Sequence, residues 1–491
     1  MKSTGLLFYA ERVYSTLTGL LFVLIVTRSL SPEEFGAWSV ISTLLSYATV
    51  ATVVNYWVTR LRSRGVVEVT VSGLALSLLF ALASSGAYLV LLPYLSGEFG
   101  VARSALLVST LYIPVLYVNG ALYSSLYAVS PARAAVSEFL FETGKTVAAV
   151  LFALSGGVSL VSALIAVLAG HILQGAFLAV STRRDLVRRP SAALAKRVLS
   201  LSTFNFAAQP STLLSSLDVP LISAVRGNLS VAYYTVVNTF SNLVGYSGVL
   251  SKGLYPSLLS VDDSSAHRER IEESLRLVLL VGIPAAAGVA ALAPNLLYLL
   301  RPDYVAAANV LRVAAVTSIV ASVNGVFSDA LQGVERADLE GKGLREVARS
   351  RIFKVFALGY VKLAVGLPGV VAAVYLSGDP LAVALLGKAS WLAAELVVFA
   401  ILLWWIRGHA RLGAVARSLL AYSAASVPAV LVALAVNPYR IREAFLALLL
   451  AGATYFGSLY VLDPWFRSQA SRVAALLARR SPPSTTSARS G

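Results

Sequence analysis

Five basic residues lie inside apolar stretches of this chain, where a charge is costly. They are Arg12, Lys252, Arg312, Lys362 and Lys388. A charge within a bilayer usually faces a wet cavity or a partner, although Arg12 and Lys252 lie near helix ends and could instead extend to water. A cavity with net positive charge predicts an anionic ligand, and phosphate is the anion that Arg and Lys donors match best. We therefore predict these five as substrate-binding residues.

Two acidic residues in apolar stretches are candidates for ion coupling or gating. Asp218 follows the polar run Gln209-Pro210-Ser211-Thr212 and precedes Pro220 by two positions. Because proline leaves a backbone carbonyl without its helical donor, we expect a bent or partly unwound helix beside this carboxylate. A simple kink facing a wet cleft is the alternative. Glu395 lies seven residues after Lys388, on the same helical face, so these two could also form a structural pair.

The remaining chemistry-bearing residue types are scarce. The chain has no Cys, one Met at position 1, and three isolated histidines, His171, His267 and His409. Thiolate nucleophiles, disulfides and Cys-based zinc sites are therefore excluded, and no His pair has metal-ligand spacing. We predict no metal site and no cofactor, and leave H+ or Na+ coupling open.

The composition shows which elements must hold these residues. Of 491 residues, 57% are hydrophobic and 13% are charged, against roughly 45–50% and about 25% in ordinary soluble domains. The mean hydropathy is +0.77. These values exclude a soluble enzyme and predict an all-α, polytopic membrane protein.

Apolar runs long enough to cross a bilayer recur along the chain, each about 20 residues long. We predict fourteen membrane spans at residues 6–27, 37–59, 70–92, 104–127, 137–154, 158–180, 200–224, 231–256, 274–298, 305–332, 355–377, 380–406, 413–436 and 443–462.

The loop charges predict the orientation of these spans. With the N-terminus inside, twenty-nine Lys and Arg fall on the inner side, Lys145 among them, and six fall in outer loops. This asymmetry follows the positive-inside rule, so we expect a multi-pass protein of the cell membrane with both termini cytoplasmic. The short loops leave no room for a catalytic domain.

The chain also divides into two similar parts. Phe35-Gly36-Ala37 and Val231-Ala232-Tyr233 are related by an offset of 196 residues, and each opens the second helix of a six-helix half. This pattern suggests a parallel duplication. The predicted parts are an N-terminal lobe, a basic cytoplasmic linker, a C-terminal lobe, two additional spans and a cytoplasmic tail disordered at its end: residues 1–180, 181–199, 200–406, 407–466 and 467–491.

Three stretches resemble a known family. They are Arg28-Ser29-Leu30-Ser31-Pro32-Glu33-Glu34-Phe35-Gly36, then Leu217-Asp218-Val219-Pro220 with Ala232-Tyr233-Tyr234, and Arg301-Pro302-Asp303-Tyr304 with Leu331-Gln332-Gly333-Val334-Glu335-Arg336. The family is the Wzx-like polysaccharide-biosynthesis and lipid-linked oligosaccharide flippases of the multidrug/oligosaccharidyl-lipid/polysaccharide exporter superfamily. The match covers roughly residues 5–340, and its motifs are specific for the family but not for a substrate.

The resemblance implies alternating access between two helical bundles. It implies a polyprenyl phosphate or pyrophosphate carrying a sugar chain as cargo, moved from the inner to the outer leaflet, with cavity Arg and Lys holding the phosphate. We expect membrane lipid as a further partner, no nucleic acid, and a monomer. A drug or small-molecule exporter on the same fold is the first alternative. A membrane glycosyltransferase or polysaccharide polymerase is the second.

Overall fold

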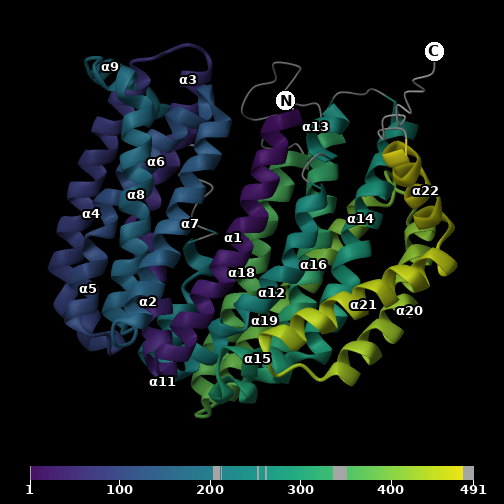
Figure 1. Ribbon diagram of the computed structural model, residues 1–491. Helices are drawn as coiled ribbons and strands as arrows, with labels where there is room; N and C mark the ends of the chain where they lie inside the picture. Colours follow the sequence, from purple (N-terminus) through teal and green to yellow (C-terminus); the bar gives the residue numbers. More distant parts are fainter. Residues whose placement is uncertain are drawn as a thin grey trace, which may run out of the picture. The chain divides into compact units, whose positions relative to one another are not determined.

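In the computed structural model the chain is helical along most of the parts that it describes. These are residues 2–202, 211, 213–251, 254–259, 263–334 and 351–478, and they contain no β-strand. Figure 1 shows the long helices, most of which run along a common direction within their bundle. The predicted all-α membrane fold is confirmed.

The helices fall into two compact units. Unit 1 comprises residues 1–239, 297–314 and 353–398, and unit 2 comprises the remaining segments. The elements up to the second half of the chain are α1 (Lys2–Ser29), α2 (Pro32–Ala48), η1 (Val50–Val54), α3 (Asn55–Ser63), α4 (Val69–Phe99), α5 (Arg103–Thr110), α6 (Tyr112–Val129), α7 (Pro131–Leu154), α8 (Leu160–Leu186), α9 (Ala192–Leu201) and α11 (Asp218–Val236).

The later elements are also helical. They are α12 (Asn238–Gly245), η2 (Tyr246–Ser251), α13 (Leu254–Leu259), α14 (Ser264–Ala291), α15 (Ala293–Leu300), η3 (Pro302–Ala307), α16 (Ala308–Val334), α18 (Arg351–Leu376), α19 (Pro380–Ile406), α20 (Leu412–Val436), α21 (Ile441–Leu462) and α22 (Pro464–Ala478). In unit 2, α14 packs on α20, and α20 packs on α21.

Nine helices among the described residues are long and apolar enough to cross a membrane. Helix α2 and the η1–α3 segment meet at a bend of 49°. They make a tenth span if the two parts are counted as one. Helices α1 and α7, which are 28 and 24 residues long, are not among these spans. The chain is therefore a multi-pass membrane protein, and the count of fourteen spans stays a prediction.

The first connection in unit 1 is fixed by local sequence. Ser31 caps α2: its hydroxyl accepts from the Glu34 amide, and the Glu34 carboxylate accepts from the Ser31 amide. This reciprocal pair satisfies two helix-end donors, and Pro32 suits the first helical turn. The stretch from Arg28 to Gly36, which resembles the flippase family, thus contains the start of α2.

The two segments related by the offset of 196 lie against each other. The Ser39 and Thr235 hydroxyls, 196 residues apart, are 2.9 Å from each other on α2 and α11. Close by, a Cβ on Gly36 would collide with the backbone carbonyl of Asn228. Gly227 allows the chain to turn there, since its φ of 77° suits glycine. Contact between equivalent positions is expected near a two-fold axis, but the predicted lobes, residues 1–180 and 200–406, remain a prediction.

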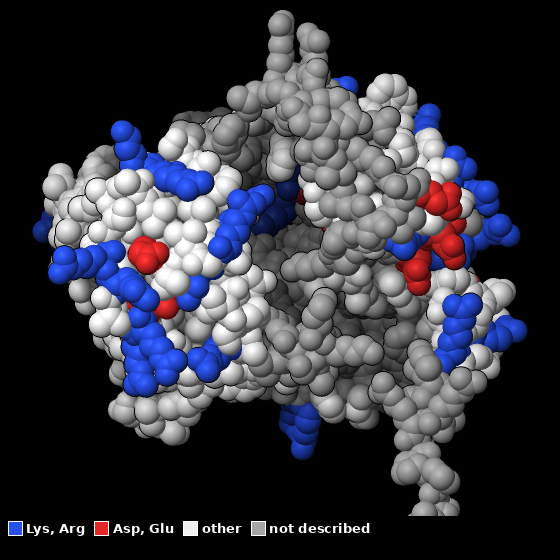
Figure 2. Space-filling view, turned by 90° about the horizontal axis from the view of Figure 1, so that it is seen from above, with Lys and Arg blue, Asp and Glu red and all other residues white. Residues whose placement is uncertain are grey.

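Basic side chains gather over one end of unit 1, formed by α3, the C-terminal end of α8, and α9 (Figure 2, left). The exposed members are Arg60, Arg64, Arg183, Arg184, Arg188, Arg189, Lys196 and Arg197. Arg62 is half-buried and forms an ion pair with Asp185 at 3.0 Å, which ties α3 to α8. The predicted inner segments of this region therefore share one surface.

Candidate functional site

A connected group of polar, charged and aromatic side chains lies in unit 1 on α11, α18, α19 and the first residue of α12. We call it the lysine–tryptophan cluster, and its members are Asp218, Tyr234, Asn238, Lys362, Lys388, Trp391 and Glu395. Four of the seven residues predicted as functional from the sequence belong to it. The cluster is a continuous series of contacts that begins at Glu395 and ends at Asn238.

Asp218 lies at the centre of the series and is buried. Its carboxylate accepts hydrogen bonds from the Tyr234 hydroxyl, from the indole N–H of Trp391 at 3.1 Å, and from the amide of Val219 at 2.7 Å. The positive end of the α11 dipole also favours a carboxylate in the first turn of the helix. Three hydrogen-bond donors are therefore directed at the Asp218 carboxylate.

The helix is broken directly before Asp218. The helix is interrupted by a turn at Ser216 and Leu217, and α11 begins at Asp218. Pro220 has no N–H to donate to the carbonyl of residue 216, four positions earlier. The expected break beside Asp218 is therefore present in the structure.

The first lysine of the cluster bridges two helices. The Lys362 ammonium on α18 forms an ion pair with the Glu395 carboxylate on α19, and it lies 5.9 Å from the centre of the Trp391 ring. Glu395 is only 4% exposed, whereas the Lys362 side chain is 38% exposed. The buried carboxylate is thus paired with a lysine that remains accessible.

The second lysine approaches the cluster from the other end. The Lys388 ammonium lies 3.9 Å from the centre of the Tyr234 ring and donates to the Asn238 side-chain oxygen at 3.0 Å. A cation over an aromatic face is attracted by the ring quadrupole. The spacing of seven had suggested a structural pair of Lys388 with Glu395, but Glu395 pairs with Lys362 on α18 instead.

Small residues allow α18 and α19 to approach closely enough for these contacts. A Cβ on Gly366 would collide with the indole ring of Trp391, so the ring packs directly on the α18 backbone. Next to it, Ser390 donates to the Gly366 carbonyl at 3.0 Å. Close contact through glycine and serine is typical of helix packing in membranes. The glycine therefore positions the tryptophan that donates to Asp218.

The cluster holds two ammonium groups, those of Lys362 and Lys388, and two carboxylates, those of Asp218 and Glu395. Asp218 is surrounded by N–H and O–H donors and by the charge of Lys388. A hard metal cation needs several oxygen acceptors instead. Among the described residues, no group of three or more Asp, Glu or His is placed to hold a metal ion. The lysines, by contrast, carry the charge that a phosphate requires.

The other predicted cations are placed differently. Arg312 on α16 is exposed and donates to the Asn309 side chain at 2.6 Å. Arg12 belongs to α1 but lies outside the residues whose side chains are described, and Lys252 lies outside the described residues altogether. All three stay predicted ligands.

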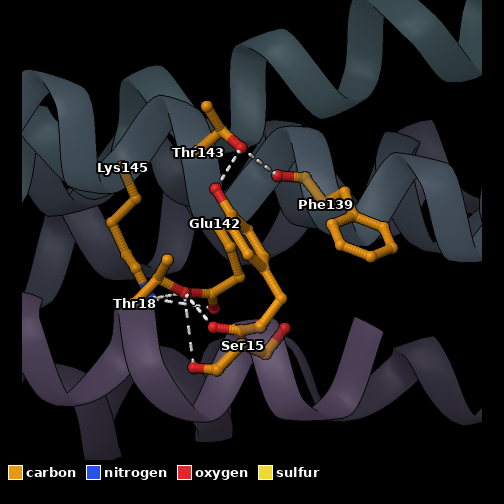
Figure 3. A network of polar contacts seen from close by, with 7 residues as sticks. Ser15, Thr18, Phe139, Glu142, Thr143 and Lys145 are labelled. Atoms are coloured by element: carbon orange, nitrogen blue, oxygen red, sulfur yellow. Dashed lines mark hydrogen bonds and ion pairs between the residues drawn. The ribbon is translucent and has the colours of Figure 1, made fainter. Parts of the chain in front are cut away.

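A second charged group in unit 1 was missed by the sequence analysis, which counted Lys145 with the inner segments. Lys145 lies within α7, is 9% exposed, and pairs with Glu142 at 2.8 Å. Figure 3 shows this network between α1 and α7. Thr18 donates to the same carboxylate at 3.1 Å, and the Tyr14 and Thr143 hydroxyls are 2.8 Å apart.

Aromatic rings enclose the missed lysine. The Lys145 ammonium lies 4.9 Å from the Phe141 ring centre and 5.2 Å from that of Phe22. The available sequence signal was a glutamate three residues before a lysine within an apolar stretch, a spacing that places both on one helical face. We call this group the α1–α7 network; its members are Tyr14, Thr18, Phe22, Phe141, Glu142, Thr143 and Lys145.

Comparison with known proteins places the fold. No family model matches the chain, and no curated protein matches it. Among solved structures, the chain resembles the lipid II flippase MurJ in its inward closed conformation, with a TM-score of 0.71 and 15% identity over 95% of this chain and 100% of that one.

Two drug-transporter structures share the fold less completely. A multidrug resistance MATE family transporter of the MOP superfamily, in an inward-facing conformation, matches with a TM-score of 0.59 and 18% identity over 80% of this chain and 95% of that one. The MATE multidrug transporter DinF-BH matches with a TM-score of 0.54 and 13% identity over 82% of this chain and 94% of that one. The chain therefore shares the fold of these lipid II flippase and MATE transporter structures.

Proposed function

We propose that this protein is a flippase that moves a polyprenyl phosphate or pyrophosphate carrying an oligosaccharide across the cell membrane. The observation that carries the proposal is the pair of lysines in membrane helices α18 and α19, joined through Trp391, Asp218 and Tyr234. Charged side chains at this depth are expensive unless they serve a ligand or a partner. A phosphate head group is the ligand whose charge and donor requirements they fit.

The fold likeness supports the same proposal. The lipid II flippase aligns over nearly all of both chains, whereas the MATE transporter leaves a fifth of this chain unmatched. We infer a duplicated architecture in which residues 1–180 and 200–406 are related lobes that work by alternating access. Cargo would move from the inner to the outer leaflet, and both termini would be cytoplasmic, as the loop charges predict.

The proposed division of labour follows from charge and accessibility. Lys362, the more accessible lysine, would meet the phosphate first and exchange its ion pair with Glu395 for the ligand. Lys388 would add a second positive charge, and Arg12, Lys252 and Arg312 remain additional candidate ligands. Asp218 and Glu395 would then act as gating partners that hold the lysines when no cargo is bound. No bond of the cargo is made or broken in this proposal, so the protein would not be an enzyme.

The test is reconstitution of the purified chain in liposomes with a fluorescent polyprenyl-pyrophosphate oligosaccharide. We expect label in the inner leaflet to become accessible to a membrane-impermeant quencher, with the lipid chemically unchanged by mass spectrometry. Protein-free liposomes and liposomes with a lipid that lacks the phosphate provide the controls.

Each alternative gives a different result in the same vesicles. Uptake of a lipophilic cationic dye without lipid flipping would identify a drug exporter. Elongation or transfer of the glycan would identify a glycosyltransferase or polymerase. Either result would overturn the proposal.

A further inference from the structure

Exposed arginines gather in unit 1 where helices α3 and α8 end, within the basic region seen in Figure 2. The charge asymmetry of the loops explains on which side of the membrane they lie, but the proposed flipping mechanism gives them no task. We call this group the α3–α8 basic surface, and its members are Arg60, Arg64, Arg183, Arg184, Arg188 and Arg189.

The two helix ends are fixed relative to each other. The Arg62 guanidinium on α3 donates to both oxygens of Asp185 on α8, at 3.0 and 3.3 Å. The Thr70 hydroxyl donates to the same carboxylate at 3.4 Å, and the Asp185 side chain is 15% exposed. Glu68 is the only other acidic residue within residues 60–68 and 183–189. The surface therefore keeps a large excess of positive charge on a fixed frame.

The length of α8 indicates the depth of this surface in the membrane. The helix has 27 residues, which at about 1.5 Å per residue exceeds the ~30 Å of hydrocarbon in a bilayer. Residues 160–180 contain no Asp, Glu, Lys or Arg, and Arg183 and Arg184 follow within one helical turn. The arginines therefore lie just beyond the apolar part of the span, at the level of the lipid head groups.

Apolar and aromatic side chains are exposed among these arginines. Val187, between the two arginine pairs of the α8 end, is 82% exposed, and Tyr56 on α3 is 52% exposed. Arg60 donates to the Tyr56 hydroxyl at 3.1 Å and lies 5.6 Å from the centre of the Trp57 ring. Tyr and Trp are enriched at the membrane interface. The positive-inside rule accounts for the arginines, but it requires no exposed apolar side chain among them.

We propose that the α3–α8 basic surface binds the head groups of anionic phospholipids in the leaflet that it faces. The planar guanidinium group matches a phosphate with two parallel hydrogen bonds. Basic clusters directly beside a membrane span are typical of anionic-lipid recognition. Val187 and Tyr56 would contact the upper part of the acyl chains while the arginines hold the phosphate. An acidic protein would match the charge equally well, but it would not require apolar contacts at this depth.

The test measures lipid binding by the purified full-length protein in an uncharged detergent. Phosphatidylglycerol or phosphatidylcholine with the same acyl chains is added, and the lipids bound to each protein molecule are counted by native mass spectrometry. We expect phosphatidylglycerol to bind at least roughly tenfold more tightly than phosphatidylcholine, since several arginines contribute. Added salt before transfer to the spectrometer should reduce this preference, because it screens exposed charges.

Substitutions then locate the lipid. Changing the four arginines of the α8 end to Gln should lower the affinity for phosphatidylglycerol roughly tenfold or more and leave that for phosphatidylcholine unchanged. Val187→Ser, which keeps every arginine, should lower it about threefold through lost apolar contact. The matched control removes the same charge from exposed residues of unit 2 and should keep the preference; it changes Arg407, Arg411, Arg417 and Arg472 to Gln. Thermal unfolding shows that each variant is folded.

Three outcomes would overturn the proposal. The first is equal affinity of the wild-type protein for the two lipids. The second is an equal loss of preference in the unit 2 control, which would make the effect one of net charge alone. The third is binding of soluble polyglutamate through the same arginines without a preference for phosphatidylglycerol, which would identify a surface for an acidic protein. Because no lipid-linked cargo is present, these outcomes are separate from failure of the flipping assay.

Discussion

The lysine–tryptophan cluster and the α1–α7 network pair the same residue types in opposite ways. In the α1–α7 network, Lys145 and Glu142 lie three residues apart on one helix, their side chains are 11% and 12% exposed, and two phenylalanine rings surround the ammonium. In the cluster, Lys362 and Glu395 come from different helices, and the lysine is 38% exposed. A pair on one helix survives any helix motion, whereas a pair between helices can exchange partners. We therefore propose a structural role for the network and a role in cargo binding for the cluster.

The strongest way to break this comparison is to remove both cluster lysines. Lys362→Gln with Lys388→Gln should lower the flipping rate roughly 100-fold, because each charged hydrogen bond to a phosphate contributes about 1.5–3 kcal/mol. The measurement is the quencher assay in liposomes, normalised to folded protein. Lys196→Gln on the exposed face of α9 is the control and should flip at the wild-type rate. A double variant that keeps more than half of the wild-type rate would remove the lysines from the mechanism.

The next effect concerns stability in the α1–α7 network. Lys145→Met leaves Glu142 without its ammonium in an apolar setting, which should cost roughly 3–5 kcal/mol and lower Tm clearly. Adding Glu142→Gln should recover most of that loss, since removing both charges of a buried pair is often neutral. Thermal unfolding in detergent measures both variants. If the double variant is stable yet does not flip lipid, the network has more than a structural role.

A smaller change isolates the contact at the centre of the cluster. Trp391→Phe removes the indole donor to Asp218 but keeps an aromatic ring on Gly366 and near Lys362. A hydrogen bond to a charged group contributes about 1.5–3 kcal/mol, so the flipping rate should fall roughly tenfold with only a small change in Tm. A large fall in Tm with an unchanged rate per folded molecule would instead make Trp391 a packing residue.

The smallest expected effect is that of Tyr14→Phe in the network. It removes one neutral hydrogen bond, to Thr143, with a contribution of about 1 kcal/mol. Flipping should be unchanged, and Tm should fall only slightly. A rate change as large as that of Trp391→Phe would show that both regions take part in transport.

The sequence predicted the fold well because hydropathy is a local property. The helix Val69–Phe99 contains the predicted span 70–92, and α19 coincides with the predicted span 380–406. The break beside Asp218 was also predictable, since Pro220 acts through its own backbone. The 49° bend between α2 and the η1–α3 segment was not predicted, because the stretch has neither Pro nor Gly and the Thr49 and Thr52 hydroxyls donate instead to backbone carbonyls of the preceding turn.

The partners of the charged residues were harder to predict. Spacing identifies residues on one helical face, so it offered Lys388 for Glu395, but it carries no information about the neighbouring helix that supplies Lys362. Lys145 was counted with the inner-side charges although it falls within the predicted span 137–154, since spacing alone does not show whether a lysine in an apolar stretch is buried. Its burial depends on Phe22 and Phe141, which are brought together only by the packing of α1 on α7.

The contact of Gly36 with Asn228 has a consequence for how transport would be observed. The helices that meet there, α2 and α11, belong to different predicted lobes, so a rocking motion between lobes would pivot on this bare backbone contact. A methyl group added at position 36 would push α2 and α11 apart at this contact. The effect of Gly36→Ala would be a changed angle between the lobes, measured as a changed distance between two spectroscopic labels. The stability of each lobe would stay the same. A chain without cysteine is well suited to that measurement, because the cysteines introduced for labelling would be its only thiols.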